Sequence, residues 1–368
     1  MFFMSKEYTC IDIGTNSIKA VQFKAKKDKL KLIDIGIQKL PPKTIVDGLI
    51  VDDSMVASEL QSLLKSLKNK PKNIITTVPN DNLLIRNIEM PAMDKKEIRE
   101  SLKWEADEQL PYPVENAALD YLKIEEDEES IKYIVAAVKK NVVDNYLDPF
   151  KRLNLKPKVI NVQPMALVSL LDFQNEIDSN IAVVDIGASA TQITIANNKN
   201  IMLSRTIDTG GSSFTNSIME TMDLDYQSAE EKKAEININL EANSAEDPSE
   251  EFLDSMPIGM EIESGTDIDL TDISTRLSSE VTRSLDFFNM KHRDKEVEKI
   301  FITGGASRLT GLKQLISDEI GREMILIDPF KNINRKLNNE GEELVEQFNY
   351  EFAVAVGLAV SEVMVDES

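Results

Sequence analysis

The chain has 368 residues and a formal net charge of −22, which is enough length for two lobes, or for three domains, that each bury a core. This charge argues against nucleic acid and anionic membrane surfaces as main partners, because both require clustered Lys and Arg. The one cysteine cannot form an intrachain disulfide, and the one histidine excludes a His-rich metal site. No apolar run reaches the roughly 18 residues of a membrane span, and the apolar start at residues 1–4 is too short for a signal peptide. We therefore expect a soluble protein of a reducing compartment.

The first two predicted strands, residues 8–13 and 18–23, are joined by a turn of small polar residues at 15–17. In the tripeptide Asp12-Ile13-Gly14, the glycine lets the backbone approach an anion closely, and the small residues leave backbone N–H groups to face phosphate oxygens. The Asp12 carboxylate suits Mg²⁺, which proteins hold largely through water, and Lys19 adds a positive charge. The alternative for this single copy is a plain hairpin turn.

A third strand at 29–39, a helix at 54–67 and a strand at 72–78 follow. The third strand contains Asp34-Ile35-Gly36, but no small or hydroxylated residues come after it. We therefore predict a plain strand there rather than a second anion-binding turn. Cys10 lies inside the first apolar strand.

After Pro79 the pattern indicates a separate module. Asp94 and Glu97 resemble a helix cap, apolar residues recur at 98, 102, 106 and 110, and Pro111 ends the helix. Strands at 117–124 and 131–138 flank an acidic turn, and a helix at 142–153 and a strand at 158–162 complete the module. Trp104 lies off the apolar stripe. It is either an exposed anchor for a partner or the core of a helix buried on two sides.

The first hairpin is then repeated. Gln163 opens an apolar helix, and Asp185-Ile186-Gly187, followed by small residues at 188–190, lies 185 − 12 = 173 residues after the first copy. Two such hairpins facing each other across a cleft would hold a polyphosphate and its metal between two lobes.

The rest of the chain adds glycines and an acidic segment. Gly210 and Gly211 lead into a helix, and residues 234–275 contain no Lys or Arg. The irregular spacing of the acids there favours a solvated insertion over a cation site. After a helix at 272–288, a strand at 300–302 meets Gly304 and Gly305, which either lie flat against a base or ribose or form a turn with positive φ. A helix follows at 312–320, and we expect the small-residue helix at 352–359 to pack between the lobes.

In this order the motifs resemble the actin, Hsp70 and sugar-kinase ATPase superfamily over nearly the whole chain. The resemblance implies an α/β, actin-like ATPase fold of two ribonuclease-H-like lobes, with ATP and Mg²⁺ in the cleft. It implies metal binding by Asp12 and Asp185, and positioning of an attacking water by Gln163. For Glu230 and Lys233 the alternative is a solvated helix face. The implied nucleotide-binding residues are Gly14, Thr15, Asn16, Ser17, Lys19, Gly187, Ala188, Ser189, Gly210, Gly211, Glu230, Lys233, Gly304, Gly305 and Ser307.

The module at 80–155 resembles one in the cell-division protein FtsA. Its amino-acid sequence is more similar to that of the type IV pilus assembly protein PilM family. The similar stretches are residues 86–93, 105–106, 110–113 and 119–121, with Glu97. FtsA-like proteins usually end in an amphipathic membrane-targeting helix, whereas residues 361–368 are too short and too acidic for that role. The chain is therefore identified as resembling PilM.

This resemblance implies a cytoplasmic scaffold under the inner membrane that binds ATP with slow or no hydrolysis. Its partner would be the cytoplasmic N-terminal tail of a PilN-type bitopic membrane protein, which it would link to the pilus assembly motor, without nucleic acid and without direct membrane insertion. The alternatives are an FtsA-like, self-associating filament protein and a small-molecule kinase, for which no distinctive substrate loop is present.

The same resemblance predicts four subdomains. The first lobe core comprises residues 1–79, 156–178 and 342–368, and residues 80–155 form the inserted partner-binding subdomain. The second lobe core comprises residues 179–213 and 289–341, and residues 214–288 form a nucleotide-covering subdomain that includes the acidic insertion.

Overall fold

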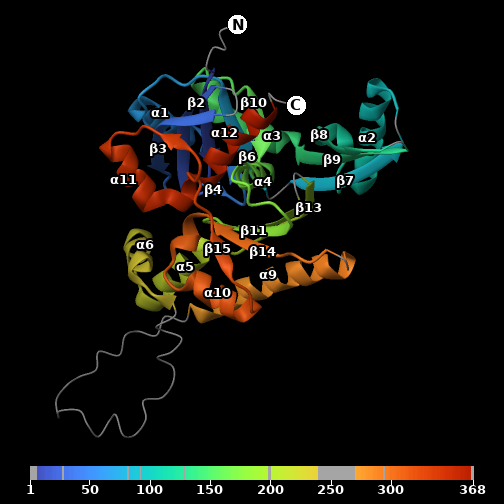
Figure 1. The fold of residues 1–368 in the computed structure, drawn as a ribbon. Coiled ribbons are helices and arrows are strands. Elements are labelled where there is room, and N and C mark those ends of the chain that lie inside the picture. Colours follow the sequence, from blue (N-terminus) through green and yellow to red (C-terminus); the bar gives the residue numbers. More distant parts are fainter. Residues whose placement is uncertain are drawn as a thin grey trace, which may run out of the picture.

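The computed structural model describes residues 6–26, 29–80, 83–91, 93–127, 129–197, 200–238, 270–292 and 295–365. Most of the predicted acidic insertion, residues 239–269, and the last three residues lie outside the described residues. Figure 1 shows two lobes, each built on one large sheet, with a smaller sheet beside the upper lobe. The predicted two-lobe α/β architecture with an inserted module is therefore confirmed.

The first lobe is built on a six-stranded sheet in the order β10-β6-β1-β2-β3-β16. The Asp34 tripeptide lies within β3, which confirms that it is a plain strand. Gly36 there allows close packing of α1, because a Cβ would lie 2.7 Å from the Leu63 Cδ1 atom. The strands are β1 (Lys6–Ile13), β2 (Ser17–Lys26), β3 (Lys29–Lys39), β6 (Ile74–Val78), β10 (Val159–Val162) and β16 (Asn334–Arg335), with a two-residue pair β4 (Ile45–Val46) and β5 (Leu49–Ile50) alongside.

The helices of this lobe pack on that sheet and on one another. The prediction that the small-residue helix packs between the lobes is wrong, because among the described residues its main partners are α4, β1, β2 and β6 of the first lobe. A Cβ at Gly357 would lie 2.3 Å from the Ala166 carbonyl oxygen, so glycine is needed for this close approach. The helices are α1 (Asp53–Ser66), α3 (Lys140–Arg152), α4 (Gln163–Phe173), α11 (Asn339–Phe348), η3 (Asn349–Phe352) and α12 (Ala353–Val365).

The inserted module has its own small sheet, in the order β7-β9-β8, and a core that includes Ile88, Leu102 and Tyr133. The predicted helical stripe is confirmed, because residues 98, 102, 106 and 110 are all buried. Asp94 occupies the N-cap position of this helix, as predicted, but its side chain makes no capping hydrogen bond. The elements are β7 (Leu84–Pro91), α2 (Lys95–Gln109), η1 (Val114–Asn116), β8 (Ala117–Glu126) and β9 (Ser130–Lys139).

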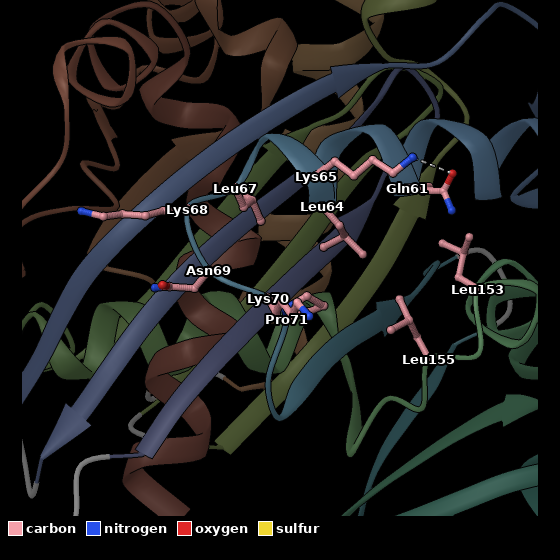
Figure 2. Close-up of a pocket in the computed structure, with 10 residues that line it drawn as sticks. All are labelled: Gln61, Leu64, Lys65, Leu67, Lys68, Asn69, Lys70, Pro71, Leu153 and Leu155. Atoms are coloured by element: carbon pink, nitrogen blue, oxygen red, sulfur yellow. Dashed lines mark hydrogen bonds between the residues drawn. The ribbon is translucent and has the colours of Figure 1, made fainter.

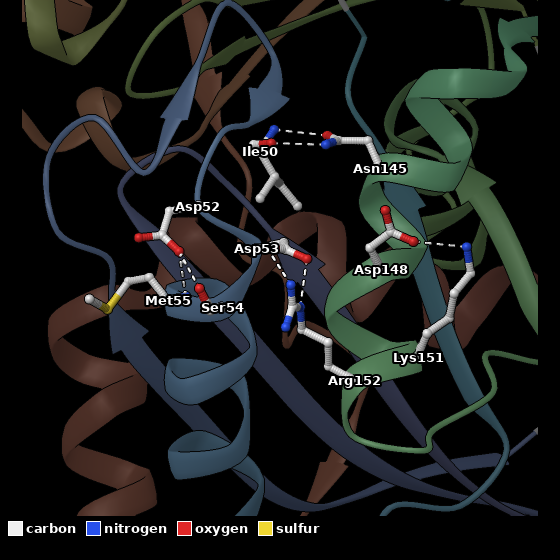
Figure 3. Close-up of polar contacts among 9 residues, drawn as sticks. All are labelled: Ile50, Asp52, Asp53, Ser54, Met55, Asn145, Asp148, Lys151 and Arg152. Atoms are coloured by element: carbon white, nitrogen blue, oxygen red, sulfur yellow. Dashed lines mark hydrogen bonds and ion pairs between the residues drawn. The ribbon is translucent and has the colours of Figure 1, made fainter.

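Helix α3 returns the chain from the module to the first lobe and is held there by two polar contacts (Figure 3). The Asn145 side chain donates to the Ile50 carbonyl and accepts from its N–H, both at 2.8 Å. The Arg152 guanidinium forms two hydrogen bonds with Asp53, of 2.6 and 3.0 Å. The module is therefore joined to the first lobe through α3 and the start of α1.

The second lobe is built on a five-stranded sheet in the order β13-β12-β11-β14-β15. Strand β13 also lies beside β7 of the inserted module, where the Asn87 side chain donates to the Ile201 carbonyl at 3.0 Å. The strands are β11 (Asn180–Ile186), β12 (Thr191–Asn197), β13 (Asn200–Ile207), β14 (Lys299–Thr303) and β15 (Met324–Leu326). The helices are α5 (Gly211–Met222), α6 (Tyr226–Glu235), α9 (Thr271–Lys291), η2 (Gly305–Arg308) and α10 (Leu312–Ile320).

No helix in the described part of the chain is both long enough and apolar enough to cross a bilayer. Cys10 is a buried free cysteine in β1, as predicted. The residue boundaries of the four predicted subdomains stay a prediction.

Candidate functional site

A cleft of about 790 Å³ lies where the two predicted turns meet. Residues from both sheets line it, including Asp12 and Asp185, both turns, Gln163 and residues of α6 and η2. Sequence positions 173 residues apart therefore come together at one site.

The two turns have the same backbone geometry. The Gly14 N–H donates to the Ser17 carbonyl at 3.0 Å, and the Gly187 N–H donates to the Ala190 carbonyl at 2.9 Å. Each aspartate stands opposite a polar residue on the next strand, Asp12 opposite Lys19 and Asp185 opposite Gln192. The turns also touch each other, with 2.9 Å between the Thr15 and Ser189 hydroxyl oxygens. The predicted pair of facing hairpins is therefore present.

The two aspartates form a partly buried acidic pair. Asp12 is 4% exposed, and within the described ranges its Oδ1 atom has no hydrogen-bond partner. Burial raises the pKa of Asp12, while the positive charge of Lys19, whose Nζ lies 3.8 Å from Oδ2, and a hydrogen bond from Gln163 act to lower it. Burial also raises the pKa of Asp185, to about 6, with a further contribution from Asp12. A cation would relieve both effects.

These residues fit a hydrated divalent cation better than a protein-only metal cage. No group of three or more His, Cys, Asp or Glu side chains that could hold a metal occurs among the described residues. Mg²⁺ typically uses one or two carboxylates, several waters and the phosphates of its ligand. The unpartnered Asp12 oxygen beside Asp185 supplies that kind of donor set.

The glycines of the turns leave room that a side chain would fill. A Cβ at Gly14 would lie 3.2 Å from the Lys19 Nζ, and one at Gly187 would lie 3.0 Å from the Ala190 carbonyl oxygen. Gly210 is not among the cleft-lining residues, and a Cβ there would lie 2.7 Å from the Ala188 carbonyl oxygen. Gly210 therefore lets the start of α5 pack on the second turn, where the Gly211 N–H donates to the Gly187 carbonyl at 2.9 Å.

Gly304 and Gly305 line the cleft at the end of β14. Gly304 has φ of +91°, which bears out the turn interpretation, and a Cβ there would lie 2.4 Å from the Asp185 Oδ1 atom. Ser307 is buried away from the cleft lining, and its hydroxyl donates to the Gly304 carbonyl at 2.6 Å. Ser307 thus supports the glycine turn, and its predicted contact with adenosine stays a prediction.

Glu230 and Lys233 of α6 line the cleft, and both are half-buried. The alternative of a fully solvated helix face is therefore not what the structure shows. The Lys233 ammonium contacts the Glu230 carboxylate and donates to the Thr215 hydroxyl at 2.7 Å. Their contact with ribose and base stays a prediction.

Gln163 is the first residue of α4 and faces the cleft. Its Oε1 accepts a 2.6 Å hydrogen bond from the Asn80 side chain. A role in positioning water stays a prediction.

Sequence reasoning missed several cleft residues. Gln192 occupies the place of Lys19 in the second hairpin, and alignment of the two copies could have found it. Arg308 and Glu351 join the walls of the cleft through a 3.3 Å ion pair. The Gly304 N–H and the Thr303 hydroxyl both donate to the Tyr350 carbonyl, at 3.4 and 3.0 Å. No sequence pattern indicated these contacts, because they join segments far apart in the chain.

Trp104 lies outside the cleft, on α2, and 72% of its surface is exposed. The core alternative for Trp104 is therefore wrong. An exposed tryptophan is unusual enough to suggest a contact surface.

Two lobes with matching turns around one cleft define an actin-like ATPase fold. The chain belongs to the type IV pilus assembly protein PilM family, whose sequence profile matches residues 10–256 and 264–363. A solved structure described as a PilM-PilN type IV pilus biogenesis complex is 25% identical with a TM-score of 0.79, and the match covers 97% of this chain and 98% of that one.

Two curated relatives are more distant. The cell division protein FtsA of Bacillus subtilis (strain 168) is 21% identical over 355 residues, which cover 88% of this chain and 78% of the relative. The FtsA protein of Streptococcus pneumoniae (serotype 2, strain D39) is 19% identical over 250 residues, which cover 61% of this chain and 54% of the relative. The chain thus matches about half the length of the latter. These comparisons confirm the predicted fold and family.

Proposed function

We propose that this protein is a nucleotide-binding scaffold of type IV pilus assembly that binds the cytoplasmic tail of a PilN-type bitopic membrane protein. The observation that carries the proposal is the similarity to the PilM-PilN complex, with a TM-score of 0.79 over 97% of the chain. In this proposal the protein is cytoplasmic, is held at the inner membrane through its partner, and links that partner to the assembly motor.

In the proposal the ligand of the cleft is ATP with Mg²⁺. Asp12 and Asp185 would hold the cation through water, and it would neutralise part of the phosphate charge. The backbone of residues 14–17 and 187–189 and the Lys19 ammonium would bind phosphate oxygens. Gly304, Gly305, Glu230 and Lys233 would lie beside the adenosine. The unpartnered Asp12 oxygen and the space left by the glycines support this assignment.

We propose slow or no hydrolysis. Both carboxylates at the turns are assigned to the metal, so neither is left as a general base for an attacking water. Gln163, the remaining candidate for positioning that water, already accepts a hydrogen bond from Asn80. ATP would therefore act mainly by setting the angle between the lobes.

In the proposal, nucleotide binding in the cleft would change the position of the inserted module, which contacts the PilN-type tail. Its strand β7 lies beside β13, and β13 pairs with β12, which begins just after the second turn. The hydrogen bond from Asn87 to the Ile201 carbonyl joins the module to this strand. A change in the angle between the lobes would therefore shift the module, whose exposed Trp104 is the proposed partner contact.

Isothermal titration with a PilN-type tail peptide, with and without Mg-ATP, tests the proposal. We expect saturable binding whose affinity depends on the nucleotide, and at least about tenfold weaker binding by Trp104→Ala, because exposed tryptophans often dominate interfaces. Phe287→Ala is the matched control, since this aromatic is 56% exposed but lies on α9 of the other lobe. No binding in either condition would refute the partner proposal.

The second candidate is an FtsA-like filament protein, which the match to the Bacillus subtilis FtsA supports. Filaments of the purified chain with Mg-ATP, seen by pelleting and negative-stain microscopy, would favour this alternative.

A further inference from the structure

The fold gathers lysines on one side of a chain whose net charge is −22. They lie at the opposite end of β1 and β2 from the turn at Gly14, on the β2–β3 ribbon and on the loop between α1 and β6. We call this surface the lysine face, and it comprises Lys24, Lys26, Lys29, Lys31, Lys68, Lys70 and Lys72.

In the part of the lysine face formed by β2 and β3, lysines stand directly opposite lysines on the neighbouring strand. Lys24 stands opposite Lys31, and Lys26 stands opposite Lys29. The alternate residues, at 23, 25, 30 and 32, are buried, so all four lysines lie on the same exposed side of the ribbon. Like charges directly opposite each other destabilise a sheet. Folding alone therefore does not explain this arrangement.

The loop part is fixed on the same side of the sheet. The Gln22 side chain, two residues before Lys24 on β2, donates to the Asn69 carbonyl at 2.7 Å and accepts from its N–H at 3.2 Å. The Glu7 carboxylate, which lies 3.2 Å from the Lys24 Nζ and 2.7 Å from the Lys72 Nζ, joins strand to loop. The seven lysines therefore form one continuous surface.

Most of this positive charge is not neutralised. Within the described residues, Lys26, Lys29, Lys31, Lys68 and Lys70 form no ion pair. The Asp34 carboxylate below them is 8% exposed and accepts a hydrogen bond from the Lys68 N–H at 2.5 Å. Figure 2 shows the Lys68 side chain extending away from the nearby leucines.

We propose that the lysine face contacts the anionic phospholipid headgroups of a bilayer surface. In physiological salt, charges are screened beyond roughly 8 Å, so the local lysines decide this contact despite the acidic remainder of the chain. The contact is peripheral and involves no insertion.

Three features favour a lipid surface over nucleic acid or a phosphorylated peptide. Every cation of the lysine face is lysine, a point charge suited to mobile headgroups, whereas ordered phosphates are commonly bound by the planar fork of arginine. Single-stranded nucleic acid is usually bound by aromatic side chains on which the bases stack, and the exposed Trp104 and Phe287 lie on other elements.

The third feature is an apolar edge. A shallow pocket of about 360 Å³ borders the lysine face and shares Lys68 and Lys70 with it (Figure 2). Its other lining residues include Leu64, Leu67, Leu153 and Leu155. Lysines beside an apolar surface are typical of proteins that bind at the membrane interface.

Vesicle flotation of the purified full-length chain tests the inference without any membrane protein, so its result is independent of the tail-binding proposal. We expect binding to vesicles of equal parts phosphatidylcholine and phosphatidylglycerol, loss of binding at high salt, and no binding to pure phosphatidylcholine. The triple variant Lys26→Gln/Lys29→Gln/Lys31→Gln should bind on the order of a hundredfold more weakly, because each lysine near an anionic surface contributes roughly a fivefold factor. Its melting temperature should not fall, since the variant removes like-charge pairs.

The matched control is Lys103→Gln/Lys291→Gln/Lys295→Gln, which removes the same charge from exposed positions on α2 and near the end of α9. It should bind as the wild type does. An equal loss in both variants, or no binding by the wild type, would overturn the inference. Binding of poly-glutamate or of duplex DNA as tight as binding to the vesicles would also overturn it, and would indicate an acidic protein or a nucleic acid as partner.

Discussion

At the scale of single residues, the main chemical feature of the cleft is its pair of aspartates, one from each turn. Asp12 is almost fully buried and Asp185 is half-buried, and burial raises the pKa of both. Two neighbouring buried carboxylates destabilise the folded state unless a cation binds to them or one of them is protonated. Their placement therefore favours ligand binding over stability.

Replacement of Asp185 by asparagine tests this trade-off. The folded protein holds the Asp185 proton up to about pH 6, while the unfolded chain releases it near 3.8, so the folded state binds more protons between these values. The contribution of Asp185 to the free energy of unfolding therefore falls as the pH rises through this range. Asp185→Asn should remove that fall and be more stable than wild type at pH 7, by about 1 to 3 kcal/mol.

Chemical denaturation from pH 3.5 to pH 8 without nucleotide measures this effect. Asp286→Asn, an exposed change on α9, is the control and should follow the wild type. A variant that was less stable than wild type at pH 7 would show that Asp185 contributes to the fold itself.

The turn residues could be predicted from the sequence, because the Asp-Ile-Gly tripeptide followed by small residues occurs twice and is typical of a tight turn between two strands. Gln192 could also have been found, by aligning the second copy with the first. Arg308, Tyr350 and Glu351 could not, because their position in the cleft depends on how η2 meets η3. Gly210 and Ser307 were predicted to bind the nucleotide, but neither is among the cleft-lining residues, and both support the glycine turns instead.

At the scale of elements, the strands and helices that could be predicted are those in which buried and exposed residues alternate with a regular period. Strand β3 and helix α10 have the predicted bounds, since their patterns are strongly periodic. Strands β7 and β13 were missed because their exposed and half-buried residues do not alternate regularly with buried ones. Helix α12 was found, but small residues indicate close packing without saying against which neighbour.

The junction between α3 and the first lobe gives a prediction at this scale. Asn145→Ala would leave the Ile50 N–H and carbonyl without their partners, which should lower the free energy of unfolding by about 1 to 3 kcal/mol. Asp148→Ala, on the same helix (Figure 3), removes only an exposed ion pair with Lys151 and should have little effect. Urea denaturation of both variants measures this difference, and equal losses would show that the Asn145 contact does not secure α3.

At the scale of the whole molecule, the lobes meet through contacts at the cleft and beyond the far end of α4. These include the hydroxyl contact between the turns, the Arg308 to Glu351 ion pair and a 2.8 Å hydrogen bond from the Gln174 side chain to the Asp328 carbonyl. The sheet of the second lobe also touches the inserted module at β7. A ligand between the turns is therefore well placed to change the angle between the lobes and the position of the module.

Isothermal titration with Mg-ATP measures whether the two turns together bind one magnesium nucleotide. We expect one saturable site in the wild type, and binding at least about tenfold weaker in Asp12→Ala and Asp185→Ala, because each removes a carboxylate that would hold the cation. Asp286→Ala should bind as the wild type does. At about 100 times Kd the nucleotide should stabilise the wild type by roughly 2.7 kcal/mol. No heat of binding in the wild type, or unchanged affinity in both turn variants, would contradict binding at the two turns.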